Sequence, residues 1–152
     1  MPMQCDIVTQ ERTVYSGEVD AVNLPGSEGR MGILPNHTAL LTTLGYGEVI
    51  VRTDDQEEFF AIGGGFAEIQ PDHVTILADS AEHAAEIDIE RAIEARARAE
   101  KFMDEGVPED PERYAQIRAS LARAQIRVDV ARRRRRRQMP MGRSASAEED
   151  DS

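Results

Sequence analysis

A short run in the second half of the chain carries the residue types best suited to binding chemistry. The run is Ile87-Asp88-Ile89-Glu90-Arg91-Ala92. On a helix, Asp88 and Arg91 lie one turn apart, so their side chains can point the same way. An ordinary ion pair on a solvated helix face would give the same spacing.

Three further arginines extend this pattern. Arg98 lies two helical turns beyond Arg91, and Arg123 and Arg127 are four residues apart in a later segment. If the two segments pair antiparallel, these guanidinium groups can gather around a polyphosphate, since each can donate two parallel hydrogen bonds to phosphate oxygens. The spacing alone does not separate this from arginines on a solvated face.

Six consecutive arginines, Arg132 to Arg137, form the most concentrated charge in the chain. Repulsion among them disfavours a stable helix there. Two interpretations stay open: a solvated helix end that complements the helix dipole, or an anion-binding arm for RNA, acidic protein or lipid headgroups. The acidic segment Glu148 to Asp151 could fold back and screen the run.

Other potentially reactive groups favour structural roles. Gly63-Gly64-Gly65 lacks a phosphate-loop frame and no helix follows it, so it predicts a tight turn or a close strand crossing. The three histidines are not spaced as metal ligands, and the single Cys5 suits a strand interior. We expect no metal, no catalytic residue and no enzyme activity of the chain alone.

The elements that must position these residues fall into two groups, beginning with strands. Residues 3–78 contain short segments rich in Val, Ile, Phe and Thr, separated by turn signals about ten residues apart. This spacing predicts an antiparallel β-sandwich or barrel without crossover helices. The expected strands are CDIVT, EVDAVNL, TALLTTL, GEVIVR, EEFFAI, GFAEIQ and HVTILA.

Helices follow the strands. Residues 87–103 are rich in Ala, Glu and Arg, with Asp88 as the expected N-cap and small residues at helical spacing. Residues 104–112 break this helix, and Asp110 followed by Pro111 is typical of a new helix start. The second helix carries an apolar seam from Tyr114 to Val128, so we expect an antiparallel hairpin. Two ordinary amphipathic helices packed on the sheet would show the same pattern.

Composition and charge agree with this division. The chain has 152 residues and a net charge of -11; residues 1–87 hold 15 acids and 3 arginines, whereas residues 88–152 hold 14 acids and 15 bases. We expect an α+β protein with a β-sandwich domain at 1–85, a helical hairpin domain at 86–137 and a disordered acidic tail at 138–152. Net acidity argues against a general nucleic-acid coat.

Three stretches resemble the epsilon subunit of bacterial F-type ATP synthases: GSEGRMGILPNHTALLTTLGYGEV at 26–49, IGGGFAEIQPDHVTILADSAE at 62–82, and IDIERA with the Ala/Arg-rich helix after it. Their order and spacing also match, and the resemblance covers about residues 3–130. The tail from Arg132 onward is outside the usual pattern. The resemblance implies the same sandwich and hairpin.

The resemblance also implies a function. It implies a non-catalytic subunit of the central stalk, peripheral to the cytoplasmic face of the cell membrane, that couples rotation to proton-driven ATP synthesis. The sandwich would contact the gamma subunit and the membrane c-ring. The hairpin would extend toward the alpha/beta catalytic hexamer and inhibit ATP hydrolysis, and in some members ATP holds it folded.

Site residues carry over from the resemblance by position. The family motif I/L-D-x-x-R-A matches the run that begins at Ile87, and it implies a regulatory ATP as the only possible cofactor. The implied nucleotide contacts are Glu82, Ile87, Asp88, Arg91, Ala92, Arg98, Arg123 and Arg127. The implied c-ring contact is Glu28, Gly29, Arg30 and Met31, with Arg30 where many members carry an acid, and His37 is the implied gamma contact.

Two rival functions stay open on the sequence alone. One is a free-standing β-sandwich adaptor whose helices bind another protein. The other is an RNA-binding protein that uses the arginine run. The favoured interpretation requires gamma and c-ring partners and expects no nucleic acid.

Overall fold

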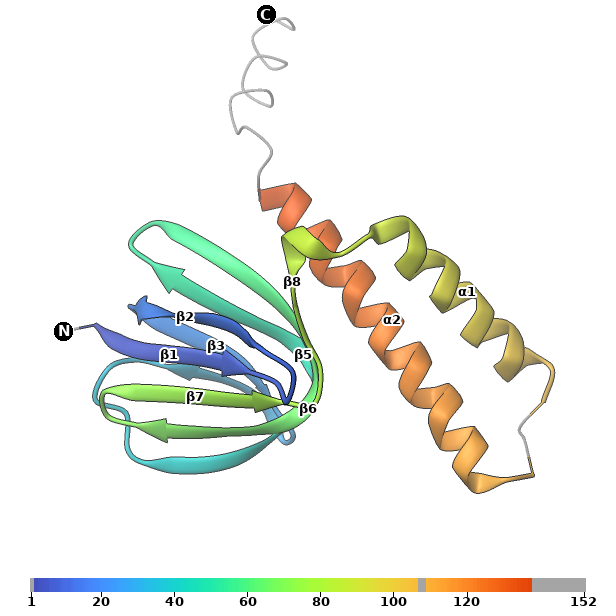
Figure 1. Ribbon diagram of the computed structural model, residues 1–152, viewed down its shortest axis with the longest axis horizontal. Coiled ribbons are helices and arrows are strands. Elements are labelled where there is room, and N and C mark those ends of the chain that lie inside the picture. The colour runs from blue at the N-terminus through green and yellow to red at the C-terminus, as the bar shows by residue number, and fades with distance from the viewer. Residues whose placement is uncertain (1, 107–108, 138–152) are drawn as a thin grey trace, which may run out of the picture.

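A computed structural model describes residues 2–106 and 109–137 and shows a strand-rich half followed by two helices (Figure 1). The predicted acidic tail at 138–152 lies outside the described residues. The elements are β1 (Met3–Val8), β2 (Thr13–Val19), β3 (Ala21–Gly26), β4 (Gly29–Ile33), β5 (Leu40–Thr53), β6 (Gln56–Gln70), β7 (His73–Ala78), β8 (Ala81–His83), the 3₁₀ turn η1 (Ala84–Glu86), α1 (Ile89–Asp104) and α2 (Pro111–Arg137).

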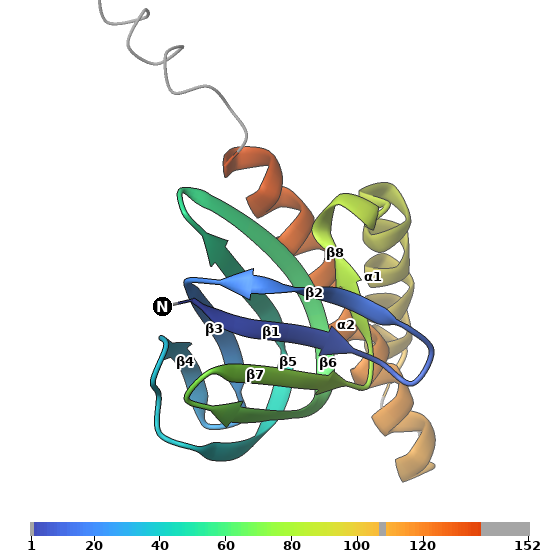
Figure 2. The same ribbon diagram turned by 60° about the vertical axis from the view of Figure 1, so that its left-hand side comes forward.

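The strands form a sandwich because β5 and β6 are long enough to take part in both layers. The first half of β5 pairs with the second half of β6, which continues through β7 and β1 to β2. The second half of β5 pairs with β3, which pairs with β4, while the first half of β6 pairs with β8. Figure 2 shows the two layers facing each other.

Several strand boundaries differ from those expected. Two pairs of predicted segments fuse into β5 and β6, and EVDAVNL divides into β2 and β3 at Asp20. The sequence did not predict the short strands β4 and β8, since their glycines and charged residues obscure the alternation of apolar and polar side chains. The β1–β7 pair is parallel, whereas the other pairs are antiparallel, because the whole of β2–β6 serves as the long connection that parallel neighbours need.

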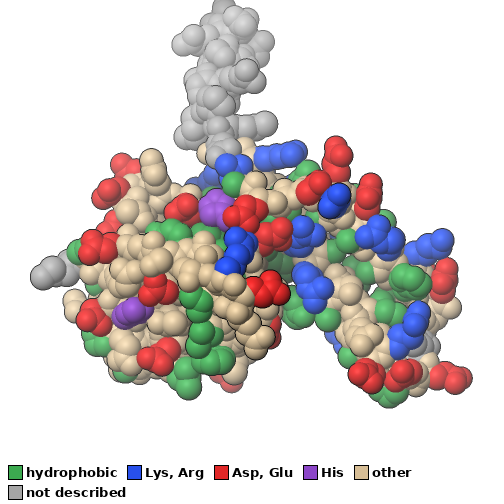
Figure 3. Space-filling view, viewed as in Figure 1, with side chains coloured by type: hydrophobic (Ala, Val, Ile, Leu, Met, Phe, Trp, Pro, Cys, Tyr) green, Lys and Arg blue, Asp and Glu red, His purple; other side chains and the backbone are tan. Residues whose placement is uncertain are grey.

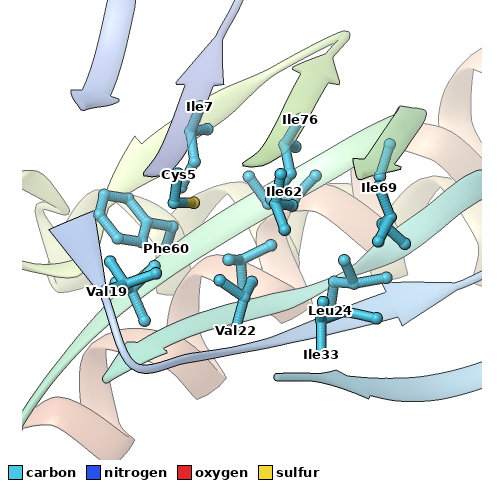
Figure 4. Packing of buried hydrophobic residues seen from close by; sticks show 14 of the residues in the cluster. Cys5, Ile7, Val19, Val22, Leu24, Ile33, Phe60, Ile62, Ile69 and Ile76 are labelled. Carbon is cyan, nitrogen blue, oxygen red and sulfur yellow. The ribbon is translucent and has the colours of Figure 1, made fainter. Parts of the chain in front are cut away.

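Aliphatic side chains fill the space between the layers (Figure 4). Met3, Cys5 and Ile7 alternate inward along β1 and are almost fully buried. Burial raises the pKa of the Cys5 thiol to about 12, so this cysteine is a core residue and not a reactive thiol.

Close strand crossing explains the triple glycine. Gly64 and Gly65 have φ of 79° and 112°, and a Cβ on Gly65 would collide with the Leu77 carbonyl of β7. The crossing predicted for Gly63-Gly64-Gly65 is therefore confirmed, and it lets β6 bend from one layer to the other.

The helices form the predicted antiparallel hairpin. Asp88 caps α1 by accepting a hydrogen bond from the Arg91 amide, and Asp110 caps α2 by accepting one from the Glu112 amide at 3.0 Å. The expectation that the arginine run disfavours a helix was wrong, because α2 continues to Arg137. Glutamates on the sandwich compensate part of its charge, as described below.

α2 carries the contact between hairpin and sandwich, and it lies between the sandwich and α1 (Figure 1). A small apolar cluster joins the two parts: Phe59, Ala61, Ala84 and Val130 are buried, with Ile50, Ile87 and Ile126 packed around them. Most of the apolar core lies inside the sandwich and is separate from this cluster.

Candidate functional site

The motif at the start of α1 has both capping and solvent-facing members. Arg91 Nε lies 3.6 Å from Asp88 Oδ2, so the predicted alignment of these two side chains is confirmed. The Arg91 side chain is 83% exposed. Ala92 is buried, and Ile87 packs against the cluster that joins hairpin and sandwich. Asp88 is therefore tied to helix capping, while the Arg91 guanidinium remains accessible to a ligand.

The hairpin brings three of the four predicted arginines together, whereas Arg91 does not line their groove. A groove of about 450 Å³ runs between α1 and α2, and Arg98, Arg123 and Arg127 all line it. Arg113, which the sequence interpretation did not single out, is a fourth. No carboxylate lies among the lining residues, so the groove is strongly cationic. The full lining is Ala95, Arg98, Ala99, Phe102, Arg113, Gln116, Ile117, Ser120, Arg123, Ala124 and Arg127.

Small residues make this groove possible. Ala95, Ala99 and Ala124 line it, and Ala99 and Ala124 are buried. Phe102 is nearly half exposed at one side and offers an aromatic face. A lining of guanidinium groups, alanines and one aromatic ring suits an anion that also has a flat apolar portion.

Arg127 is already paired in this structure. Its Nε donates to Glu82 Oε2 at 2.8 Å and its terminal nitrogen donates to Glu82 Oε1 at 3.1 Å, so the pair is bidentate. Glu82 lies on β8, so this pair ties α2 to the sandwich. Arg98, Arg113 and Arg123 have no ion pair with any acid in the described part of the chain, so they supply the groove's available charge.

A second hollow of about 520 Å³ lies on the sandwich side of the same ion pair. Arg123 and Arg127 line it together with Arg12, but four acids line it too: Glu11, Asp79, Glu82 and Glu86. Arg12 also binds Glu86 at 3.0 Å. Because these charges offset each other, the interhelical groove is the better anion site. Blue arginine side chains are visible over the helices in Figure 3, whereas red acids predominate over the strands.

The loop expected to touch the c-ring is the β3–β4 turn. Glu28 and Gly29 are exposed at its tip. The Arg30 guanidinium does not project from it: Arg30 Nε donates to Asn23 Oδ1 and a terminal nitrogen donates to the Glu48 carbonyl, both at 2.7 Å. Burial lowers the pKa of Arg30. The charge at the tip is therefore that of Glu28.

His37 follows a turn in which its amide donates to the Leu34 carbonyl at 3.2 Å. Its ring Nδ1 lies 2.7 Å from the Thr38 carbonyl. Near it in the chain, Leu34 and Leu41 are 59% and 66% exposed. The sequence interpretation missed these leucines, although Leu40 and Leu41 are adjacent at the start of β5 and cannot both face inward.

A further group of exposed apolar side chains lies on the neighbouring strands β6 and β7. Phe66 of β6 pairs with Leu77 of β7 and with Thr43 of β5, and both apolar side chains are about 40% exposed. Exposed apolar side chains in adjacent strands are typical of an interaction surface. Strand alternation could have revealed it, had the register between β6 and β7 been known.

Within residues 2–106 and 109–137, no three His, Cys, Asp or Glu side chains are placed to hold a metal ion. Over the same residues, neither helix combines the length and apolar character that a bilayer crossing requires.

Comparisons with known proteins agree with this architecture. The sequence model of the β-sandwich domain of ATP synthase delta/epsilon chains matches residues 2–84, and that of the long α-helix domain matches residues 85–132. The ATP synthase epsilon chain of Dehalococcoides mccartyi strain BAV1 is 51% identical over 130 residues, 85% of this chain and 91% of its own. That of Herpetosiphon aurantiacus is 49% identical, covering 87% of this chain and 96% of its own.

Solved structures share the fold. A chain of the mitochondrial ATP synthase of Euglena gracilis, in a structure of OSCP, F1 and c-ring, superposes with a TM-score of 0.71 at 23% identity, covering 82% of this chain and 78% of that one. A chain from the central stalk and c-ring of the Tetrahymena thermophila enzyme gives 0.62 at 11% identity, covering 86% and 97%.

Proposed function

This chain belongs to the delta/epsilon chain family of ATP synthases, and from that membership we propose how its two parts divide the work of an epsilon subunit. The epsilon chain is a non-catalytic subunit, so its contribution is mechanical and regulatory. We place it in the central stalk, peripheral to the cytoplasmic face of the membrane, between the gamma subunit, the c-ring and the catalytic hexamer. Membership of this family argues against a free-standing adaptor or an RNA-binding protein as the primary function.

The sandwich, residues 1–85, serves as the rigid coupling element. Its continuous apolar core and the two strands shared between layers resist deformation under torque. Glu28, Gly29 and Met31 would meet the c-ring, with Arg30 bracing the turn from behind. His37 and the exposed apolar side chains would meet gamma.

The hairpin, residues 86–137, serves as the movable element. The observation that carries this proposal is the small joint between hairpin and sandwich, in which a few apolar side chains of α2 and η1 pack on Phe59 and Ala61. A contact of this size can be undone without unfolding the sandwich core. When extended, Arg118, Arg123 and the arginine run would face the catalytic hexamer and inhibit ATP hydrolysis.

A regulatory ATP would stabilise the docked hairpin by binding the interhelical groove. Arg98, Arg113 and Arg123 would hold the phosphates, and Glu82 would hold Arg127 in place at the groove through their bidentate pair. ATP at about 100 times its dissociation constant contributes about 2.7 kcal/mol. A complete switch between states needs roughly 5.5 kcal/mol, so ATP biases the hairpin without deciding its state.

Calorimetry tests the groove. Arg98→Gln and Arg123→Gln should each weaken ATP binding at least about tenfold, since each removes a charged phosphate donor. Arg118→Gln is the matched control, because Arg118 lies on α2 outside the groove and stacks on Tyr114. Equal losses in all three variants, or no heat of binding to the unaltered chain at millimolar ATP, would remove the groove as a nucleotide site.

ATP hydrolysis tests the function as a whole. A reconstituted hexamer–gamma complex should hydrolyse ATP more slowly with the full chain than with a chain ending at residue 85. Both chains should bind gamma, because the coupling surfaces belong to the sandwich. Equal hydrolysis rates would refute the regulatory role of the hairpin, and loss of gamma binding by the short chain would refute the division of labour.

A further inference from the structure

The arginine run is divided between two faces of α2. Arg133 and Arg137, one helical turn apart, face the sandwich: an Arg133 guanidinium nitrogen donates to Glu48 of β5, and Arg137 lies 3.3 Å from Glu57 of β6. Arg134 lines a hollow with acids of the β5–β6 hairpin and His83.

The other arginines of the run point away from the sandwich. Arg132, Arg135 and Arg136 are exposed, and none of them pairs with an acid among the described residues. They line a shallow surface hollow with Asp129, whose side chain already accepts a hydrogen bond from Gln125. Arg133 also lines this hollow, although its guanidinium pairs with Glu48. The six identical residues therefore have two different environments.

The contact between Arg133 and the sandwich involves a buried carboxylate, that of Glu48. Its side chain is only 4% exposed, and it is the one buried charged residue in the described part of the chain. It lies on the face of β5 that α2 covers, with the Arg133 guanidinium against Oε1, while Oε2 has no partner. Arg30 donates to the carbonyl of the same residue. Burial raises the pKa of Glu48, although Arg133 acts in the opposite direction.

We propose that Arg133 and Arg137 form an electrostatic latch that holds the end of α2 on the sandwich by pairing with Glu48 and Glu57. The family match ends at residue 132, so both latch arginines lie beyond it.

The energetics of buried ion pairs suit a reversible latch. Only Glu48 is buried in this pair, since the Arg133 side chain is 44% exposed. Desolvation of the Glu48 carboxylate opposes its attraction to Arg133, so the pair adds little net stability. Removing only Arg133 is costly, however, because it leaves a buried carboxylate without its main counter-charge. The more exposed Arg137–Glu57 pair adds attraction that salt screens. Release of the helix end would let water solvate both glutamates.

The latch acts within one chain, so its test needs no ATP synthase partner. Val130 is almost fully buried in the joint between α2 and the sandwich. In a Val130→Cys background of the full chain, the rate of reaction with a thiol reagent such as DTNB reports how often the end of α2 detaches. The native Cys5, buried in the sandwich core, reacts only when the sandwich itself unfolds and serves as an internal control.

Two double variants differ only in whether the sandwich-facing or the outward face of α2 loses positive charge. Arg133→Gln with Arg137→Gln removes the latch arginines, and Arg132→Gln with Arg136→Gln removes two outward arginines at the same spacing. We expect the first double variant to raise the reaction rate of the cysteine introduced at position 130 at least about tenfold at low salt. The second should change this rate by less than about twofold. Adding Glu48→Gln to Arg133→Gln should restore slow reaction, since the unpaired carboxylate is then gone.

Salt provides a second readout. Raising the salt concentration from about 0.05 to about 0.5 M should speed the reaction of the chain with intact latch arginines more than that of the double variant that lacks them. Equal rates in the two double variants would overturn the latch. So would simultaneous reaction of Cys5, which would show that the variant unfolds the sandwich instead of releasing the helix.

Discussion

Gly65 illustrates how a single residue fixes the shape of the sandwich. It lies where β6 passes beside β7, in a backbone conformation that L-residues with a Cβ avoid, and it has no room for a methyl group. A run of three glycines indicates such a crossing from the sequence alone. Which of the three is indispensable depends on the neighbouring strand and was not predictable.

We expect Gly65→Ala to lower the free energy of unfolding by at least about 2 kcal/mol, through the strained φ and the collision with β7. Gly45→Ala is the control, because Gly45 in β5 has open space where its Cβ would lie. That variant should remain within about 0.5 kcal/mol of the unaltered chain. Urea unfolding measures both, and equal stabilities of the two variants would contradict the crossing.

Asp6 gives the sandwich a measurable response to acid. Its carboxylate accepts hydrogen bonds from the Ser16 hydroxyl at 2.5 Å, from Gln4 and from His73. The Ser16 hydrogen bond lowers the pKa of Asp6, with Gln4 and His73 acting in the same direction. A lowered native pKa means that the ionised group stabilises the fold above its usual pKa, and that this stability is lost as the pH falls through the lowered value.

Ser16→Ala should therefore cost about 1 kcal/mol of unfolding free energy at pH 7. The cost should shrink as the pH falls through the lowered pKa of Asp6, because Asp6 is then protonated in both the folded and the unfolded state. Ser27→Ala removes a neutral hydroxyl pair with Thr43 and should show no such pH dependence. Parallel pH profiles for the two variants would argue against the charged hydrogen bond.

Among the elements, helix starts were predictable, whereas strand ends and the C-terminal end of α2 were less so. Asp88 and Asp110 cap their helices as predicted, because capping depends on residues adjacent in the chain. Strand lengths depend on partners far along the chain, which is why β5 and β6 appeared as four segments. The helical arginine run depends on the distant Glu48 and Glu57, which no local pattern reveals.

The candidate groove shows the same limit. The hairpin spacing predicted that Arg98, Arg123 and Arg127 would meet, and they do. Arg113 was not predicted, because it is not part of the spacing pattern that relates the other three. The Glu82–Arg127 pair joins two segments 45 residues apart, and only the fold reveals it.

The N-cap of α2 offers a test at this scale. Asp110→Ala should lower the stability of the hairpin by about 1 kcal/mol, because the Glu112 amide loses its acceptor. Hydrogen exchange should quicken at the start of α2 and remain unchanged in β1 and β7. Faster exchange throughout the sandwich would show that the two parts unfold together.

For the whole molecule, the two faces of the arginine run should affect ATP hydrolysis in opposite directions. Arg133→Gln with Arg137→Gln should release the hairpin, and this release should outweigh the loss of two of the six charges of the run, so that inhibition in the reconstituted complex is strengthened. Arg132→Gln with Arg136→Gln should leave docking intact and weaken inhibition, since fewer charges would face the hexamer. Hydrolysis assays at low salt measure both effects, and changes in the same direction would rule out a dual role for the run.

The position of the joint along α2 has a mechanical consequence. A helix of 27 residues is about 40 Å long, and its packing on the sandwich begins near Ile126, so the first half of α2 overhangs with α1 attached (Figure 1). The hairpin is thus attached to the sandwich at one end only, and its other end is free. A sideways force at the free end acts on the apolar joint through a long lever arm, so it should break the contacts of α2 one after another. A force along the helix axis would have to break them all at once. A small sideways force from a neighbouring subunit would therefore detach α2 more easily than a pull along its length.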